Sequence, residues 1–237
     1  MADILIYGDI GGPWEDSVLA KDVAGQLDAV PDSVTSLNVR INSLGGLSSE
    51  GLAIYNLLRA YATKRRLANS SFTLSTVVDG YAYSAASIIV MAGDRRIMHR
   101  GSMLMVHNAW LFTIGNAQEL RDAANYLDKV DLNLADIYAH HSGQDRQAIL
   151  DLMKAETFFS PEEAKAARLI DTVDDSVDTA QNKAKYGEAA ALLARSGQGS
   201  YERFMAARYN SATSKASSKG CVFPAIRLRL MEMETAA

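Results

Sequence analysis

Residues 72–91 read Phe72-Thr-Leu-Ser-Thr-Val-Val-Asp-Gly80-Tyr-Ala-Tyr-Ser84-Ala-Ala-Ser-Ile-Ile-Val-Met91. The apolar run over residues 72–78 predicts a buried strand, which we expect to end at a turn at Gly80. The small residues of 84–91 predict a helix that packs closely against a sheet. Ser84 therefore stands at a strand-to-helix turn, where the first N–H groups of the helix have no partner inside the helix. This position suits a nucleophilic serine.

Two other segments place polar groups directly after a predicted strand. Met103-Leu-Met-Val-His107 ends in a histidine, and Leu37-Asn-Val-Arg-Ile41 runs into Asn42-Ser-Leu-Gly-Gly46. In an open parallel sheet, ligands bind at the carboxyl ends of the strands, so these segments should meet Ser84 at one edge. Taken alone, each feature has an ordinary structural explanation: a polar serine, a strand-end histidine and a glycine turn before a helix. The Gly-x-Ser-x-Gly elbow of α/β-hydrolases is absent.

The remaining pattern alternates strands with helices. Beyond the segments above, strands are expected at about 4–10 and 96–98. Helices are expected at about 13–27, from a cap at Ser48 or Ser49 through 61, and at 118–138, 145–154 and 161–168, with residues 63–71 as a surface loop. Such alternation is typical of βαβ units, so we predict an α/β fold with a mainly parallel sheet.

Composition narrows the function classes. The 237 residues are 48% hydrophobic and carry a net charge of −4, which argues against a general nucleic-acid binder. One cysteine, Cys221, allows no internal disulfide and fits a reducing compartment. No apolar run reaches the length of a membrane span and no signal peptide is evident, so we expect a soluble, cytoplasmic protein. No cluster of His, Cys and carboxylates has metal-ligand spacing, so no metal or cofactor is expected.

The chain divides into an acidic body and a basic tail. Residues 183–237 hold nine basic and four acidic side chains, although the whole chain is acidic. We predict one domain at 1–176 and a partly mobile basic tail at 177–237. The other histidines are not expected to be catalytic: His99 lies in a basic stretch that should be exposed, and His140-His141 end the long helix.

Taken together, these segments resemble the Clp protease family of self-compartmentalising serine peptidases. Ile41-Asn-Ser-Leu-Gly-Gly46 is similar to the family's Asn-Ser-Pro-Gly-Gly loop, with Leu44 at the proline position. Gly80-Tyr-Ala-Tyr-Ser84 is similar to its nucleophile turn, and Met105-Val-His107-Asn to its histidine strand. Later landmarks lie at His141-Ser-Gly-Gln144 and Phe159-Ser-Pro-Glu-Glu-Ala164 through Leu169-Ile-Asp171, so the resemblance covers about residues 3–175 in order.

The resemblance implies a fold and a mechanism. The fold would be of the Clp/crotonase type, with repeated βαβ units and residues 118–138 as a protruding handle helix in a ring-like homo-oligomer. Ser84 would be the nucleophile, His107 the general base, and the N–H groups of Gly46 and Ala85 the oxyanion hole. The family's aspartate is matched here by Glu156. A longer carboxylate can still orient a histidine, and Asp151, about one helical turn earlier, is the alternative.

Two departures point to a subfamily. The first strand is expected to begin at Ile4, which predicts that no propeptide or axial loop precedes it, and the chain runs some sixty residues past Asp175. Ile6-Tyr-Gly-Asp-Ile-Gly11 and the long tail look more like the phage and prophage Clp-like head-maturation proteases. Such an enzyme would cleave scaffold and capsid proteins within a prohead, without an ATPase.

Two rival functions stay open. A crotonase-type acyl-CoA enzyme would share the fold and the oxyanion hole, but the Ser84/His107 pair argues against it. A catalytically inactive scaffold or capsid-assembly protein would keep the fold and lose the activity. The substitution at Glu156 leaves this second alternative open, and the basic tail would fit it as a docking segment for an acidic partner.

Overall fold

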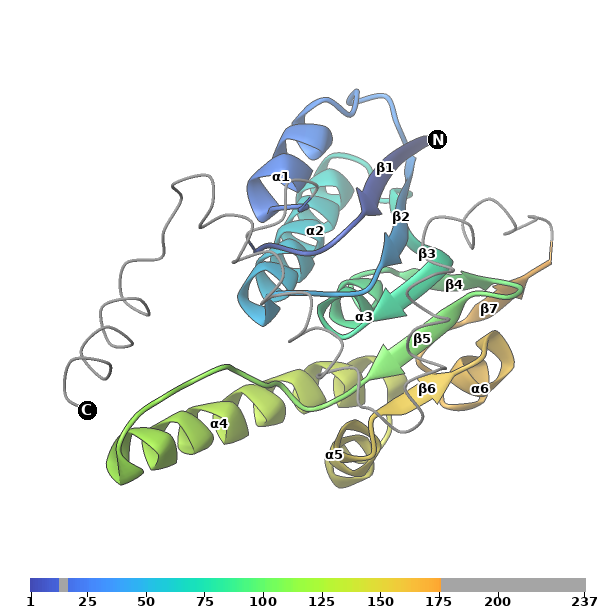
Figure 1. The fold of residues 1–237 in the computed structure, drawn as a ribbon. Coiled ribbons are helices and arrows are strands. Elements are labelled where there is room, and N and C mark those ends of the chain that lie inside the picture. Colours follow the sequence, from blue (N-terminus) through green and yellow to red (C-terminus); the bar gives the residue numbers. More distant parts are fainter. Residues whose placement is uncertain (13–16, 176–237) are drawn as a thin grey trace.

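The computed structural model describes residues 1–12 and 17–175 of the chain (Figure 1). The predicted mobile tail at 177–237 therefore lies outside the described residues. In chain order the elements are β1 (Ala2–Tyr7), α1 (Ala20–Asp28), β2 (Ser36–Ser43), α2 (Ser48–Ala68), β3 (Thr73–Tyr83), α3 (Ala85–Val90), β4 (Arg95–His99), β5 (Met103–Val106), α4 (Ala117–Ser142), α5 (Arg146–Lys154), β6 (Thr157–Phe159), α6 (Pro161–Ala166) and β7 (Thr172–Asp174).

The described strands form one sheet in the order β1-β2-β3-β4-β7. The long strand β3 pairs with β4 along its first half and with β5 along its second half, and β6 pairs with β5. Every pairing between these strands is parallel except that of β5 with β6. The predicted α/β fold with a mainly parallel sheet is confirmed.

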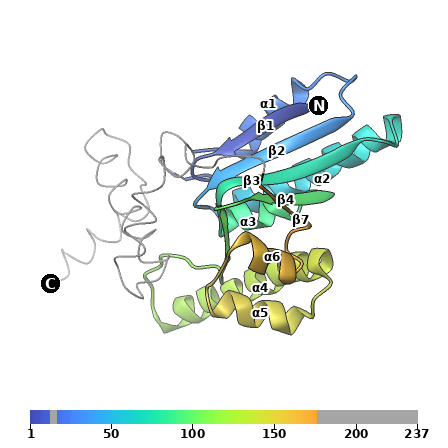
Figure 2. The same cartoon turned by 90° about the vertical axis from the view of Figure 1, so that its right-hand side faces the viewer.

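The core lies between the sheet and the helices that cover it. In β2, Leu37, Val39 and Ile41 are fully buried, and they belong to the same apolar cluster as Ile54 and Leu58 of α2. Figures 1 and 2 show α1 and α2 along the β1–β3 part of the sheet, while α4, α5 and α6 gather beside β6. This arrangement leaves the carboxyl ends of β2, β3 and β5 side by side.

Helix α2 runs further than the sequence indicates. The prediction of a surface loop at 63–71 is wrong, because α2 continues to Ala68. Arg65 explains the extension: its side chain is buried, its guanidinium donates to the backbone oxygens of Pro31, Asp32 and Val34, and it lies over the rings of Tyr61 and Phe72. The expected serine cap is also wrong, since Leu47 is the N-cap residue and both serines lie inside the helix.

Two more boundaries differ from the prediction. Helix α1 begins at Ala20, because Val18 forms a bridge with Ile10 and its N–H donates to the Asp9 oxygen. The expected helix start at residue 13 lies outside the described residues. Strand β3 continues through Gly80 to Tyr83, so Gly80 is no turn. The continuation pairs Tyr83 with Met105 of β5 and brings the next residue, Ser84, to the edge of the sheet.

Helix α4 is the expected protruding handle. Its buried residues all belong to its second half, beginning at Asp131, while Figure 1 shows its first half projecting away from the sheet. Asn116 caps its N-terminus, accepting the N–H groups of Gln118 and Glu119. Near its other end, the Tyr138 hydroxyl lies 2.6 Å from the Ser87 hydroxyl, which ties α4 to α3.

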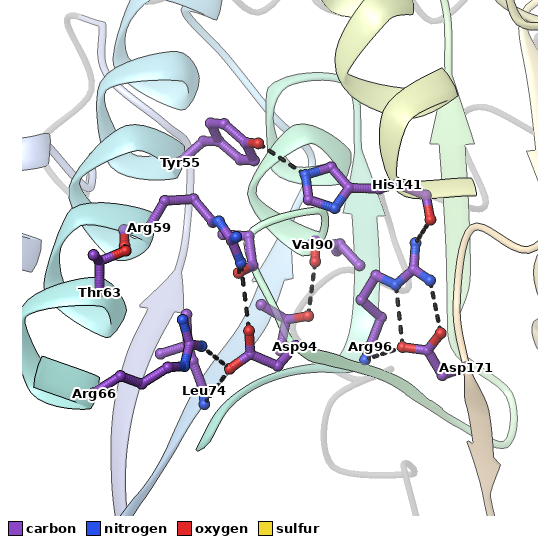
Figure 3. A network of polar contacts seen from close by, with 12 residues as sticks. Tyr55, Arg59, Thr63, Arg66, Leu74, Val90, Asp94, Arg96, His141 and Asp171 are labelled. Carbon is purple, nitrogen blue, oxygen red and sulfur yellow. Dashed lines mark hydrogen bonds and ion pairs between the residues drawn. The ribbon is translucent and has the colours of Figure 1, made fainter. Parts of the chain in front are cut away.

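A polar network joins the end of α4 to the sheet (Figure 3). Arg96 of β4 makes a bidentate contact with Asp171, with nitrogen–oxygen distances of 2.6 and 3.1 Å, and donates to the backbone oxygen of His141 at 3.0 Å. The His141 Nε2 atom lies 2.8 Å from the hydroxyl of Tyr55 on α2. The network therefore holds α2, α4 and β4 together around one histidine.

His141 should make stability depend on pH. Burial, helped by the charges of His140, Arg59 and Arg96, lowers its pKa from 6.5 to about 4. The unfolded chain binds the proton more tightly than the folded chain does. The stability that the neutral His141 ring contributes is therefore fully present above about pH 6.5 and is lost as pH falls toward 4. We expect a loss of roughly 2 kcal/mol, after allowing for solvent screening of a half-buried ring.

The measurement is the free energy of unfolding in urea between about pH 7.5 and 4.5. His141→Gln should flatten the wild-type curve over this range. His140→Gln, at the exposed neighbouring position, removes only one of the charges that lower this pKa and leaves the burial of His141 in place, so it should reduce the slope much less than His141→Gln does. Equal slopes for the wild type and His141→Gln would contradict the prediction.

Candidate active site

Ser84 lies between β3 and α3 in an unusual backbone conformation. Its φ is 53° and its ψ is −124°, a combination that non-glycine residues rarely adopt and that costs on the order of 1–3 kcal/mol. Three hydrogen bonds hold its backbone there: the Ser84 N–H donates to the Met105 oxygen at 3.0 Å, and the Ser84 oxygen accepts the Ser87 N–H at 2.9 Å and the Ser87 hydroxyl at 2.6 Å. A strained serine at a strand-to-helix turn is what an exposed nucleophile requires, although the elbow motif itself is absent.

His107 meets Ser84 across the sheet. It directly follows β5, is 6% exposed, and its Nε2 atom lies 2.7 Å from the Ser84 hydroxyl oxygen. The contact follows from the register, because β3 and β5 are parallel and pair as far as Tyr83 and Met105. The structure thus brings together the two residues that the sequence placed after separate strands.

The glycine pair follows β2 and packs against Ile10, three residues after the end of β1. Gly45 and Gly46 have φ values of 92° and 150°. The Gly45 oxygen accepts the Ile10 N–H at 2.8 Å, and the Leu47 N–H donates to the Ile10 oxygen at 2.7 Å. A Cβ on Gly46 would lie 2.0 Å from the Ile10 oxygen, so only glycine fits here.

Glu156 is placed by the pairing of β5 with β6. The last pair of this antiparallel ladder is Val106 with Thr157, so Glu156 and His107 occupy the next position on either side. Glu156 has a φ of 49°, and its N–H donates to the Met153 oxygen at 3.0 Å. The alternative, Asp151, lies on the exposed face of α5 and accepts from the Gln147 side chain at 3.0 Å. The Asp151 side chain therefore faces solvent and not the contact between Ser84 and His107.

Sequence reasoning missed Asp131 on α4. It is 8% exposed, and its Oδ1 atom accepts the Ala109 N–H at 2.6 Å, two residues beyond His107. Burial raises the pKa of this carboxyl, the charge of Asp128 adds to the rise, and the Ala109 N–H and His107 oppose it. Asp131 lies four residues after Leu127 and three before Leu134, so helical spacing puts this carboxylate on the apolar face of the helix. That spacing is the signal by which the sequence could have revealed it.

The prediction that His99 is exposed is wrong. Its side chain is 3% exposed and its Nε2 atom lies 3.2 Å from Asp79, a fully buried carboxylate on β3. Asp79 also accepts the Tyr7 hydroxyl at 2.6 Å and pairs with the guanidinium of Arg40. Burial, reinforced by Asp79, raises the pKa of Tyr7 to about 12. This cluster joins β1, β2, β3 and β4. The basic residues around His99 in the sequence gave no indication that its side chain is buried.

Metal-binding and membrane-spanning features are absent from the described part of the chain. In residues 1–12 and 17–175, no group of three or more His, Cys, Asp or Glu side chains is arranged to hold a metal ion. Nor does any helix within these ranges have the length and apolar character needed to cross a membrane.

The fold and the site together define a class of protein. A mainly parallel α/β sheet with a hydrogen-bonded serine and histidine at the carboxyl ends of neighbouring strands is typical of serine hydrolases. The family model described as Clp protease matches residues 6–177. The chain is 32% identical over 179 residues to the "ATP-dependent Clp protease proteolytic subunit" of Deinococcus radiodurans, covering 74% of this chain and 82% of that protein. The chain belongs to the Clp protease family.

Proposed function

We propose that this protein is a serine endopeptidase. The observation that carries the proposal is the 2.7 Å contact between Ser84 Oγ and His107 Nε2, in a chain of the Clp protease family. The Ser84 oxygen attacks a peptide carbonyl carbon while its proton passes to His107 Nε2. The tetrahedral intermediate then breaks its C–N bond, and His107 gives the proton to the leaving amine. Water, activated by the same histidine, releases the acyl group from Ser84.

The oxyanion hole is assigned to the N–H groups of Gly46 and Ala85. The Gly45 oxygen accepts the Ile10 N–H, so the Gly46 N–H, which lies trans to that carbonyl in the same planar peptide unit, is directed away from Ile10. Ala85 directly follows Ser84 and opens α3. Two donors from separate loops would stabilise the negative oxygen, and each is typically worth about 2.7–4 kcal/mol in the transition state.

Glu156 is proposed as the acid that orients His107. Its place opposite His107 at the end of the β5–β6 ladder supports this role. A carboxylate there would accept the imidazole N–H, hold the tautomer with a basic Nε2 and stabilise the imidazolium. The extra methylene of glutamate is compatible with a role that needs only this contact.

Glu156→Gln should lower kcat by about 100-fold with little change in KM, because the amide keeps the size of the side chain and loses the charge. The matched control is Asp151→Asn on the exposed face of α5, which we expect to stay within about twofold of the wild type. Steady-state hydrolysis of a fluorogenic peptide measures both. A fall for Asp151→Asn with none for Glu156→Gln would reverse the assignment.

The assembly and the substrate are further parts of the proposal. Members of the Clp protease family form ring-like homo-oligomers and act on protein substrates, and the exposed first half of α4 offers this chain a handle for such a ring. We assign it scaffold or capsid proteins of a phage head, with the enzyme in the cytoplasm or the prohead. Support comes from the Ile6-Tyr-Gly-Asp-Ile-Gly11 segment and the presence of residues 176–237. The basic tail would dock an acidic partner.

The test is labelling of the assembled protein with a fluorophosphonate probe, followed by peptide mass mapping. We expect the label on the Ser84 hydroxyl, and none in His107→Ala, because a serine hydroxyl needs its base to become nucleophilic. Label on another serine would move the nucleophile. An assembled ring that takes no label would favour the inactive scaffold, and binding of CoA esters without peptide hydrolysis would favour the crotonase-type enzyme.

A further inference from the structure

Asp131 has features that the proposed mechanism does not use. It is the first buried residue along α4, and the helix before it is largely exposed. A carboxylate is almost never this deeply buried unless its charge is paired or hydrogen-bonded. Here Asp131 accepts a backbone N–H from another part of the chain, that of Ala109.

The Ala109 N–H belongs to the segment that directly follows His107. Residues 107–116 follow β5 without regular secondary structure. Two hydrogen bonds hold the start of this segment: the Asn108 N–H donates to the Met153 oxygen at 3.2 Å, and the Ala109 N–H donates to Asp131 at 2.6 Å. The Asp131 bond is the shorter and has a carboxylate acceptor, and such charge-assisted bonds are about twice as strong as neutral ones. The backbone just beyond His107 is thus fastened to α4.

The carboxylate also acts on the imidazole through its charge. The positive charge of His107 favours the ionised form of Asp131. Other groups near this pair include Asp128 on the same helix, Ser84 directly after β3 and Glu156 directly before β6. In the reaction, His107 becomes positive when it takes the Ser84 proton, and a fixed negative charge nearby stabilises that state.

We propose that Asp131 is a positioning residue, which fastens the backbone after His107 and sets a negative charge beside its imidazole. It acts through His107 and does not touch the substrate. The inference rests on the proposed function. It assigns the site two carboxylates on different elements, Glu156 opposite His107 and Asp131 on the handle helix.

The test compares Asp131→Asn, Asp131→Glu and Asp128→Asn with the wild type in peptide hydrolysis across pH, with assembly mass and Tm as folding checks. Asp131→Asn keeps the size and an oxygen able to accept the Ala109 N–H, so the fold should persist. We expect kcat to fall roughly 3- to 30-fold at nearly constant KM, and the acid limb of the kcat/KM profile to move to lower pH. Asp131→Glu keeps the charge and should restore the wild-type limb.

Each outcome decides between alternatives. Asp128→Asn removes the same charge one helical turn away on the exposed face, so an equal effect there would mean a general influence of helix charge and overturn the proposal. A fall in kcat with an unchanged pH profile and no rescue by Asp131→Glu would reduce Asp131 to a structural role and also overturn it. Wild-type kinetics in Asp131→Asn would overturn this inference alone. A wild type that neither labels nor hydrolyses peptides would overturn the proposed function and this inference with it.

Discussion

Ser84→Ala should lower kcat/KM for peptide hydrolysis by about 10⁴- to 10⁶-fold and abolish fluorophosphonate labelling. The variant removes the proposed nucleophilic oxygen, while the proposed oxyanion hole and the backbone around it stay in place. The residual rate should be independent of His107, because without the Ser84 oxygen the histidine has no proton to accept. The double variant Ser84→Ala/His107→Ala should therefore be no slower than Ser84→Ala.

Ser84→Gly is the matched control for folding. The backbone at residue 84 has a φ of 53° and a ψ of −124°, which strain alanine as much as serine but suit glycine. Ser84→Ala should leave the free energy of unfolding near the wild-type value, and Ser84→Gly should raise it by about 1 kcal/mol, with both variants inactive. Inactivity together with a lower Tm in both would point to a folding defect and not to a lost nucleophile. Turnover retained by either variant would remove Ser84 from the mechanism.

Gly46→Ala should destabilise the folded chain by more than about 3 kcal/mol and abolish activity. The new Cβ would lie 2.0 Å from the Ile10 oxygen and 2.8 Å from the Ile10 carbonyl carbon, both of them backbone atoms that no side-chain rotation can move. Relief requires Ile10 or the Gly45-Gly46 turn to shift, which breaks the two hydrogen bonds that join them. The same shift displaces the Gly46 N–H from its proposed place in the oxyanion hole.

Gly25→Ala provides the control for this substitution. Gly25 lies in the middle of α1, and a Cβ added there would meet nothing within 4 Å, so alanine should raise stability by about 0.5–1 kcal/mol through its helix propensity. Urea unfolding and peptide hydrolysis of both variants give the comparison. Wild-type stability in Gly46→Ala would show that the turn adapts, and wild-type activity would take Gly46 out of the oxyanion hole.

The fold was predictable where a local pattern reports burial directly. In β2, the alternation of Leu37, Val39 and Ile41 with polar residues is itself the signature of a strand with one buried face, and the strand was found as expected. Element ends were less predictable, because they depend on distant partners. The polar segment after Tyr61 stays helical because Arg65 reaches the carbonyl groups of residues 31–34, which no local pattern of that segment contains.

The candidate site likewise has features that local sequence patterns predicted and features that depend on distant residues. The positions of Ser84 and His107 directly after strands follow from the order of apolar runs, since parallel strands present their carboxyl ends at one edge of a sheet. The opposite expectation for His99, drawn from its basic neighbours, was wrong because its burial depends on Asp79, twenty residues earlier. The structure shows that Ser84 and His107 are in contact, while the catalytic roles of Ser84, His107, Glu156, Gly46 and Ala85 stay predictions.

By itself, the sequence determined the alternation of strands and helices and the glycine pair of the turn after β2. These are properties of neighbouring residues, and short-range sterics and apolar periodicity encode them. The family was indicated separately, by the resemblance of the sequence motifs to those of Clp proteases. Only the tertiary structure decided that Ser84 and His107 lie 2.7 Å apart and that Asp131 fastens the segment after His107. Those contacts depend on how β3 and β5 pair and on where α4 packs, and both are settled by burial of the whole core and not by any one segment.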